Sequence, residues 1–492
     1  MHRCFEIPEL VDEIVSHIPL RKEYKPSLAV LARTARLFHD SALNRLWRYQ
    51  RSLRTLLLCM PPDLVQEEIV NEERILKFLR PIQSSDWERP HHYARRVRNF
   101  CSMLDDFPYS AICPWLALGT ADDCIFPNLT HLLWNQSDQN FPYIGLFLGP
   151  KVTSIIARCD TSSPLAILSQ LPKKCPSLTH LDFTHPRDDS VTEATRNLIS
   201  ALLRELRCIQ TLAIHIYDTT VLQHVARLPC LRSLCVQSLP TTIPPAQGPL
   251  FTSLRRLRCE KSIPSSMSRV LELCPDNTLD AFDMGIQGSE GPGGMRQLLA
   301  TVQNSQRSSL RELRIRSLHS DEGIGDHNTI ECMRPALGFA KLTHLHISSR
   351  PRFDFDDLAI SEMARAWPQL ECLEIMEVAD TDHIRTTLRS LHHLALHCPN
   401  LQTVSMAFTT DIVPSVGDAS NQSMSFLNVQ LSHVSPSQVP PVAQFLGGIF
   451  PNLQEVSSYG IGEHLDDDRW EQVEALLPSH VGESTREKDA EP

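Results

Sequence analysis

The chain has 492 residues, of which 42% are hydrophobic and 21% charged, and its formal net charge is −11. A single hydrophobic core stops growing near ~250–300 residues, so this length requires several domains or a repeat array. The composition argues against global disorder, and the negative charge argues against a general nucleic-acid binder.

The fifteen cysteines form no C-x-x-C pair, which argues against a disulfide framework or a zinc ribbon and predicts reduced thiols. No secretory signal opens the chain, and no run approaches ~18 consecutive apolar residues. We therefore expect a cytoplasmic or nuclear protein, or one found in both compartments, with no membrane span.

Residues 1–54 are predicted to form a helical module. Pro8 suits the first turn of a helix, and apolar residues then recur on one helical face up to Ile18, where Pro19 ends the helix. Three short helices in about 45 residues are marginal alone, so a partner is expected to cover an apolar side of the module.

Two further helices complete this predicted module. Ser27 is a candidate N-cap for a second helix that reaches Phe38. Asp40 or Ser41 is the candidate start of a third helix that reaches Trp47.

Residues 55–125 are predicted to form a rigid helical bridge followed by a degenerate capping repeat. The expected helices rest on the apolar residues Leu64, Ile69, Ile75, Leu76 and Leu79. Tyr93, Val97 and Phe100 are expected to begin the degenerate repeat.

A repeated apolar triplet dominates residues 126–462. In each copy, a first apolar residue is followed three positions later by a second and two further on by a third, as in Leu178, Leu181 and Phe183. Six copies carry a proline two residues before the first apolar position, which is Leu129, Leu178, Leu231, Leu370, Leu401 or Leu453. Thirteen copies between Leu129 and Leu453 give a mean period of about 27 residues, within the range of leucine-rich repeats.

The last two apolar residues of each triplet are two positions apart, which predicts a short strand. Apolar residues at helical spacing precede most triplets and predict a helix there. Stacked strand-plus-helix units bury a continuous core, with right-handed crossovers that keep the strands parallel. The predicted fold is therefore an α/β leucine-rich-repeat solenoid, with a parallel sheet on the concave face and helices on the convex face. The C-P-x-L copies at Cys175 and Cys398 resemble cysteine-containing, ribonuclease-inhibitor-like repeats. The alternative is a generic α/β domain with frequent leucine.

Residues 463–492 carry ten acidic and three basic residues. This segment is predicted to be a solvated acidic tail with a disordered end, beyond Trp470 and Leu477.

The run Ile7-Pro8-Glu9-Leu10-Val11-Asp12-Glu13-Ile14-Val15-Ser16-His17-Ile18 resembles the opening of an F-box. The later run from Leu31 to Trp47 is also similar, and together they resemble fungal-type F-box proteins with C-terminal leucine-rich repeats. The chain departs from the family at Ile7, Val15 and Thr34-Ala35, and an insert at residues 21–25 lengthens the first loop. The resemblance implies that this module docks a Skp adaptor, which links to a cullin. The adaptor-binding residues it implies are Pro8, Leu10, Val11, Ile14, Ile18, Leu31 and Phe38, with an internal core as the alternative role.

The residues that alternate with the strand leucines are expected to face the concave side. The candidate target-binding residues are Arg256, Arg258, Glu260, Arg314, Arg316, His344 and His346, with Glu374 beyond them. This face is expected to be basic and to bind an acidic or phosphorylated segment of a target. The alternative is a solvated charged face.

No catalytic motif emerges, and no cofactor is expected. The loop Gly288–Gly294 lacks the Gly-Lys-Ser/Thr end of a phosphate-binding loop. His393 and His397 are four residues apart beside Cys398, but no carboxylate lies between them as in a zinc hydrolase and Cys398 is the repeat cysteine, so a solvated or packed pair is expected rather than a metal site. The chain is therefore predicted to be a non-enzymatic substrate receptor of an SCF-type ubiquitin ligase. The alternatives are a protein-binding scaffold and a Skp-bound protein with no role in ubiquitination; a hydrolase has no supporting motif.

Overall fold

The computed structural model divides the chain into two compact units, Met1–Leu231 and Arg232–Pro492. It describes residues 7–19, 25–70, 73–103, 109–119, 124–137, 139–158, 167, 169–184, 193–216, 218–240, 243, 250–287, 291–317, 330–348, 354–376, 384–458 and 467–478. Within these residues, every helix is too short or too polar to cross a membrane.

The first unit opens with three helices and continues with a parallel sheet. The helices are α1 (Pro8–Ser16), α2 (Lys25–Thr34) and α3 (Arg36–Trp47). The parallel strands, in spatial order, are β1 (Tyr49–Gln50), β4 (Asn99–Ser102), β5 (His131–Asn135), β6 (Ser154–Arg158), β7 (His180–Thr184) and β8 (Thr211–Ile214). The other helices are α4 (Arg54–Leu57), α5 (Glu88–Ala94), α6 (Tyr109–Gly119), α7 (Leu171–Lys174), α8 (Glu193–Glu205) and α9 (Thr219–Ala226).

The second and third helices begin earlier than the sequence predicted. Helix α2 starts at Lys25 rather than after a Ser27 cap, because Pro26 already presets the backbone of its first turn. Ala35 is extended, with φ −151° and ψ 147°, so the break falls there and α3 begins at Arg36 rather than at Asp40 or Ser41. Phe38 therefore lies in the first turn of α3.

The predicted helical bridge is wrong over residues 65–78. Strands β2 (Val65–Val70) and β3 (Glu73–Phe78) form an antiparallel hairpin, in which Glu67 pairs with Leu76. β-Branched residues such as Ile69 and Ile75 favour strands over helices. The parallel ladder starts before the hairpin, since β1 pairs with β4 and β4 pairs with β5.

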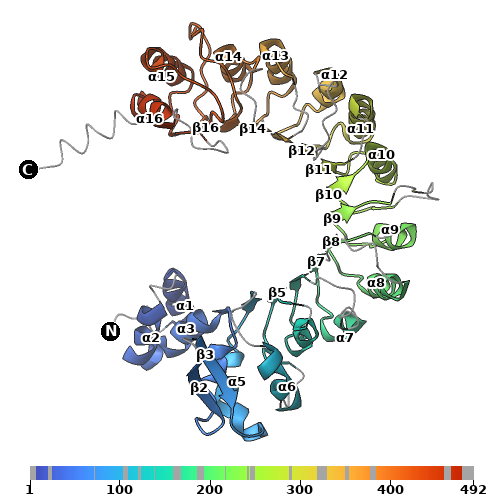
Figure 1. Ribbon diagram of the computed structural model, residues 1–492, viewed down its shortest axis with the longest axis vertical. Helices are drawn as coiled ribbons and strands as arrows, with labels where there is room; N and C mark the ends of the chain where they lie inside the picture. The colour runs from blue at the N-terminus through green and yellow to red at the C-terminus, as the bar shows by residue number, and fades with distance from the viewer. Residues whose placement is uncertain are drawn as a thin grey trace, which may run out of the picture. The chain divides into compact units, whose positions relative to one another are not determined.

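The second unit is a run of parallel strands with helices on one face (Figure 1). Its strands are β9 (Ser233–Ser238), β10 (Arg256–Ser262), β11 (Ala281–Ile286), β12 (Glu312–Ser317), β13 (His344–Ser348), β14 (Cys372–Met376), β15 (Thr403–Ser405), β16 (Phe426–Asn428) and β17 (Glu455–Ser457). Its helices are α10 (Pro264–Glu272), α11 (Gly291–Gln306), α12 (Ile330–Met333), α13 (Asp357–Ala366), α14 (Leu388–His397), α15 (Val439–Ile449) and α16 (Asp467–Ala475).

The predicted repeat register is confirmed in both units. Within each unit, the middle residue of a triplet pairs with its counterpart on the next strand, as Leu313 does with Leu345 and Leu345 with Leu373. These three leucines are at most 1% exposed. Every triplet therefore places its apolar residues on the helix-covered side, and the intervening residues occupy the open face of the sheet.

Part of the predicted acidic tail is a packed helix. Trp470 on α16 is 1% exposed, and its indole N–H donates to the carbonyl of Ser432 over 2.8 Å. Its ring meets Phe408 edge-on at 6.0 Å between centroids. Val473 and Leu477 are also buried, so α16 covers the apolar end of the last repeat. Residues 459–466 and 479–492 lie outside the described part of the chain.

Replacing Trp470 with alanine is expected to lower the free energy of unfolding by about 3–5 kcal/mol, because a buried aromatic side chain and its indole hydrogen bond are both lost. Urea denaturation measures this change. Glu471→Ala, an exposed change on the same helix, should shift stability by less than about 0.5 kcal/mol. Equal effects of the two variants would show that α16 is not a cap.

Candidate protein-binding surfaces

The N-terminal helices share a small core. Val11 and Val15 of α1 and Leu28 of α2 are buried, and Ile18, Leu31, Leu37, Phe38 and Leu46 pack partly against them. The spacing of Val11 and Val15 places both on one face of α1.

The module is attached to the sheet of its own unit through α3. Trp47 stacks on Tyr93 with ring centroids 4.7 Å apart, and Arg96 pairs with Asp40 over 2.7 Å. The hydrogen bond from Arg96 lowers the pKa of the Asp40 carboxyl. The third helix therefore packs the module onto the first repeat.

The other face of α1 is apolar and exposed. Ile7, Leu10 and Ile14 are 46%, 43% and 48% exposed. Their i, i+3, i+7 spacing places them in one row, which we call the α1 row. Val30 of α2 is also 51% exposed. An exposed apolar row beside a filled core is what a partner-binding helix requires.

The residues that the resemblance implied for adaptor binding separate into three groups. Pro8, Leu10 and Ile14 are exposed, whereas Ile18, Leu31 and Phe38 are half-buried. Val11 is 0% exposed, so its role is internal packing and it is removed from the candidate surface. Ile7, which departs from the F-box motif, is exposed and belongs to the α1 row.

A polar cleft of about 470 Å³ lies beside α1. Its lining includes Glu9, Asp12 and Glu13 of α1 and the arginines Arg45, Arg48 and Arg96. The Arg45 guanidinium donates to the carbonyl of Ile18 over 3.0 Å. The sequence did not indicate this cleft, because its two walls come from separate segments.

The open face of β10–β14 carries charges of both signs. Its outward positions hold the arginines Arg256, Arg258, Arg314 and Arg316 and the carboxylates Glu260, Asp283, Glu312 and Glu374. The four positive and four negative charges balance. The prediction of a basic face is therefore wrong, because it left out Asp283 on β11 and Glu312 on β12. Asp283 lies between the apolar strand residues Phe282 and Met284. The alternation of this weak repeat therefore already predicted that Asp283 faces the open side.

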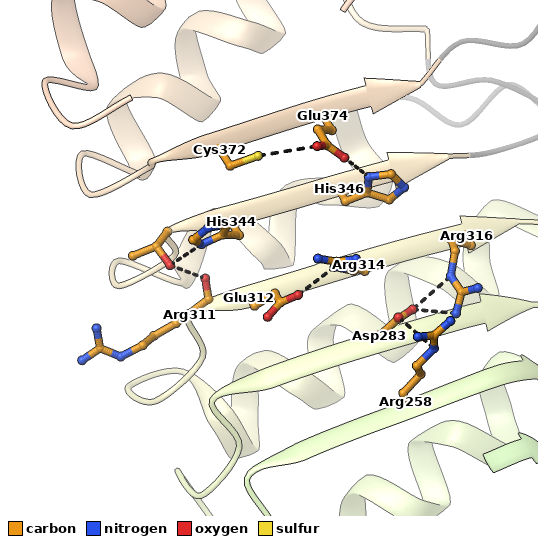
Figure 2. Close-up of polar contacts among 11 residues, drawn as sticks. Arg258, Asp283, Arg311, Glu312, Arg314, Arg316, His344, His346, Cys372 and Glu374 are labelled. Atoms are coloured by element: carbon orange, nitrogen blue, oxygen red, sulfur yellow. Dashed lines mark hydrogen bonds and ion pairs between the residues drawn. The ribbon is translucent and has the colours of Figure 1, made fainter. Parts of the chain in front are cut away.

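Three of these arginines are paired within the sheet (Figure 2). Arg316 contacts Asp283 at 2.9 Å. It also contacts Glu260 of β10 at 3.0 Å. Arg258 lies 2.8 Å from Glu260 and 3.3 Å from Asp283. Arg316 reaches across β11 to β10, because Gly285, its register partner on β11, has no side chain in the way.

Arg314 pairs with Glu312 of its own strand over 2.7 Å. Arg258, Arg314 and Arg316 are therefore already engaged, and an incoming anion would have to compete with a carboxylate for each of them.

The two histidines of the predicted set lie on β13. His346 forms a hydrogen bond with Glu374, and the Cys372 thiol lies 3.8 Å from the other oxygen of that carboxylate. The hydrogen bond from His346 lowers the pKa of Glu374, whereas burial opposes this. Burial, with the nearby Glu374 charge, raises the pKa of Cys372 to about 12. His344 is exposed, with its Nδ1 2.9 Å from the hydroxyl of Thr343.

The described residues contain no group of three or more His, Cys, Asp or Glu side chains arranged to hold a metal ion. Burial lowers the pKa of both His393 and His397. The Cys398 thiol donates to the carbonyl of Ala364 over 3.5 Å, and burial raises its pKa to about 12. This cysteine therefore remains a packed, protonated thiol.

The repeat spacing and register define a leucine-rich-repeat fold. No family model matches the chain, and no curated protein matches it. Among solved structures, the leucine-rich repeat-containing protein LegL7 from Legionella pneumophila is similar at 12% identity and a TM-score of 0.33, covering 66% of this chain and 90% of that one. A chain of the Rad7 and Elc1 complex in yeast is similar at 12% identity and a TM-score of 0.34, covering 67% and 76%. The fold assignment rests on the geometry of this chain, because these similarities are too distant to support an argument.

The Glu374 contact predicts a pH dependence of stability. The folded-state pKa of Glu374 is lowered. Ionised Glu374 therefore stabilises the folded state above its unfolded-state pKa near ~4.3, and this stabilisation is lost as pH falls through the folded-state pKa. Wild type should exceed Glu374→Gln in stability by up to about 1 kcal/mol at neutral pH, and the gap should close below about pH 4. Urea midpoints at several pH values measure this. A gap that widens on acidification would contradict it.

Proposed function

We propose that this chain is a substrate-receptor subunit of an SCF-type ubiquitin ligase. The N-terminal module docks a Skp adaptor, which links to a cullin, and the leucine-rich repeats capture a target protein. The observation that carries the proposal is the α1 row: Ile7, Leu10 and Ile14 are exposed on a helix whose opposite face is fully used in the module core. The resemblance of residues 7–18 to an F-box supports a Skp adaptor as the partner.

The energetics support docking of a protein on this row. Full burial of an aliphatic side chain contributes about 1.5–3 kcal/mol, so covering a half-exposed one contributes about 1 kcal/mol. The three side chains of the α1 row together supply several kcal/mol, which is the scale that a central apolar cluster contributes to a specific interface.

In this proposal the chain does no chemistry itself. It holds the target next to the ubiquitin-carrying enzyme and raises the effective concentration of the target there. The open face of β10–β14 supports the capture role, because its polar side chains are held in place by contacts such as that of Arg316 with Asp283.

Replacing Leu10 or Ile14 with aspartate is expected to weaken co-purification with a Skp adaptor by at least about tenfold, because a charge would be buried against an apolar partner. The fold should survive, since both side chains are about half exposed. Quantitative pull-down and thermal unfolding measure the two effects. The matched control is Leu358→Asp, a leucine of α13 that is 72% exposed.

Retention of the adaptor by both α1 variants, or an equal loss with Leu358→Asp, would contradict the proposal. Cullin recruitment separates the remaining alternatives. Adaptor with cullin supports a ligase subunit, adaptor alone supports a role outside ubiquitination, and neither partner supports a protein-binding scaffold.

A further inference from the structure

Several arginines of the second unit lie at the edge of the sheet where strands β9–β13 begin. The backbone N–H of Arg255 donates to the carbonyl of Arg232, that of Asp280 to Arg255, and that of Arg311 to Asp280. These hydrogen bonds place the residues in one row, just before the first residue of each strand. Arg256 stands next to this row as the first residue of β10. We call Arg232, Arg255, Arg256 and Arg311 the edge arginines.

Three of the four edge arginines differ from the paired arginines Arg258, Arg314 and Arg316 in having no internal partner among the described residues. Arg232, Arg256 and Arg311 are exposed, and none of their side chains has a hydrogen bond or ion pair within the described residues. Arg255 uses one nitrogen, which donates to the carbonyl of Thr278 over 3.1 Å. Figure 2 shows the Arg311 side chain pointing away from the paired charges around Asp283. Guanidinium groups that lack an internal partner are available to an external anion.

The surroundings of the row add positive charge. Arg307 and Lys341 lie in the turns before β12 and β13 and are exposed. The acidic residues of this edge are fewer: Asp276 and Asp280 before β11, and Glu312, which is already paired with Arg314 over 2.7 Å. The edge is therefore cationic, in a chain whose formal net charge is −11.

We propose that the edge arginines bind an anionic segment of the captured target protein, through carboxylate or phosphate oxygens. This inference rests on the proposed function, because the ligand is a part of the target. Neighbouring strands lie ~4.8 Å apart, so Arg232 and Arg255 are one strand spacing apart and Arg255 and Arg311 are two. An extended peptide advances ~3.3 Å per residue, so acidic side chains three positions apart would span about the two strand spacings between Arg255 and Arg311.

A peptide fits this edge better than a nucleic acid or a membrane. Single-stranded nucleic acids need exposed aromatic side chains for base stacking, and membranes need exposed apolar ones. Between Ile156 and Leu358, the described residues include no exposed large hydrophobic side chain. Asp280 also interrupts the positive row, which disfavours a continuous phosphate backbone.

The test measures binding of a labelled ten-residue peptide with six glutamates to the full-length chain. A matched peptide with six glutamines and a peptide with phosphoserines are measured in parallel. The glutamate peptide should bind, the glutamine peptide should not, and binding should fall with salt. If only the phosphoserine peptide binds, the anion is a phosphate group, and the proposal stands in that form.

The double variant Arg256→Glu, Arg311→Glu should lower the affinity for the anionic peptide by about tenfold or more. The matched control is Arg269→Glu, Arg334→Glu, which changes the net charge equally at arginines of the helix-covered side that are 61% and 50% exposed. The control should bind within about twofold of wild type. Where the glutamate variant does not fold, Arg256→Gln, Arg311→Gln replaces it, with a smaller loss in the same direction.

Three outcomes would overturn the proposal: no anionic peptide binds, the control loses as much affinity as the edge variant, or an oligonucleotide of equal charge binds more tightly than either peptide. Adaptor co-purification is measured on the same variants. Adaptor binding without peptide binding refutes the edge site alone, whereas peptide binding without adaptor binding refutes the proposed ligase role alone.

Discussion

The in-register parallel ladder is the constraint on which the rest of the structure depends. One apolar position of each repeat pairs with the same position of the next, as Leu313 does with Leu345. A slip of one residue would turn every apolar side chain to the open face, so burial of the core holds the register. The same register sets the polar surface, because it alone brings Arg316, Asp283 and Glu260 of three strands together.

The first repeats of the N-terminal unit and the last repeats of the C-terminal unit are covered differently. At the C-terminal end, α16 covers the last apolar layer with Trp470, and this helix has no large exposed row of its own. At the N-terminal end, α3 makes the attachment through Trp47 and Tyr93, and α1 keeps an apolar side that is about half exposed among the described residues. The terminal repeats of an array need capping elements, and of the two described here the N-terminal module also presents an exposed apolar surface.

Periodic features were predictable from the sequence, and single breaks in the pattern were not. The triplets placed the strands because burial repeats with a fixed spacing. The hairpin at residues 65–78 was missed because Ile75, Leu76 and Leu79 follow helical spacing, and the β-branched character of Ile69 and Ile75 was not weighed against it. The helix break at Ala35 carries no proline or glycine signal. The charge of the open face depends on Asp283, which belongs to a weak repeat. Only the strand pairing shows that Asp283 lies between Arg258 of β10 and Arg314 of β12.

Helix α1 uses one face for the module core, and the proposed function requires that it offers the other face to an adaptor. Hydrogen–deuterium exchange of the full-length chain, with and without a Skp adaptor, tests it most directly. Amides of residues 8–16 and of the neighbouring helix at 25–34 should gain protection when the adaptor is added, while those of β10–β14 stay unchanged. Unchanged exchange in residues 8–16 at saturating adaptor would contradict the account.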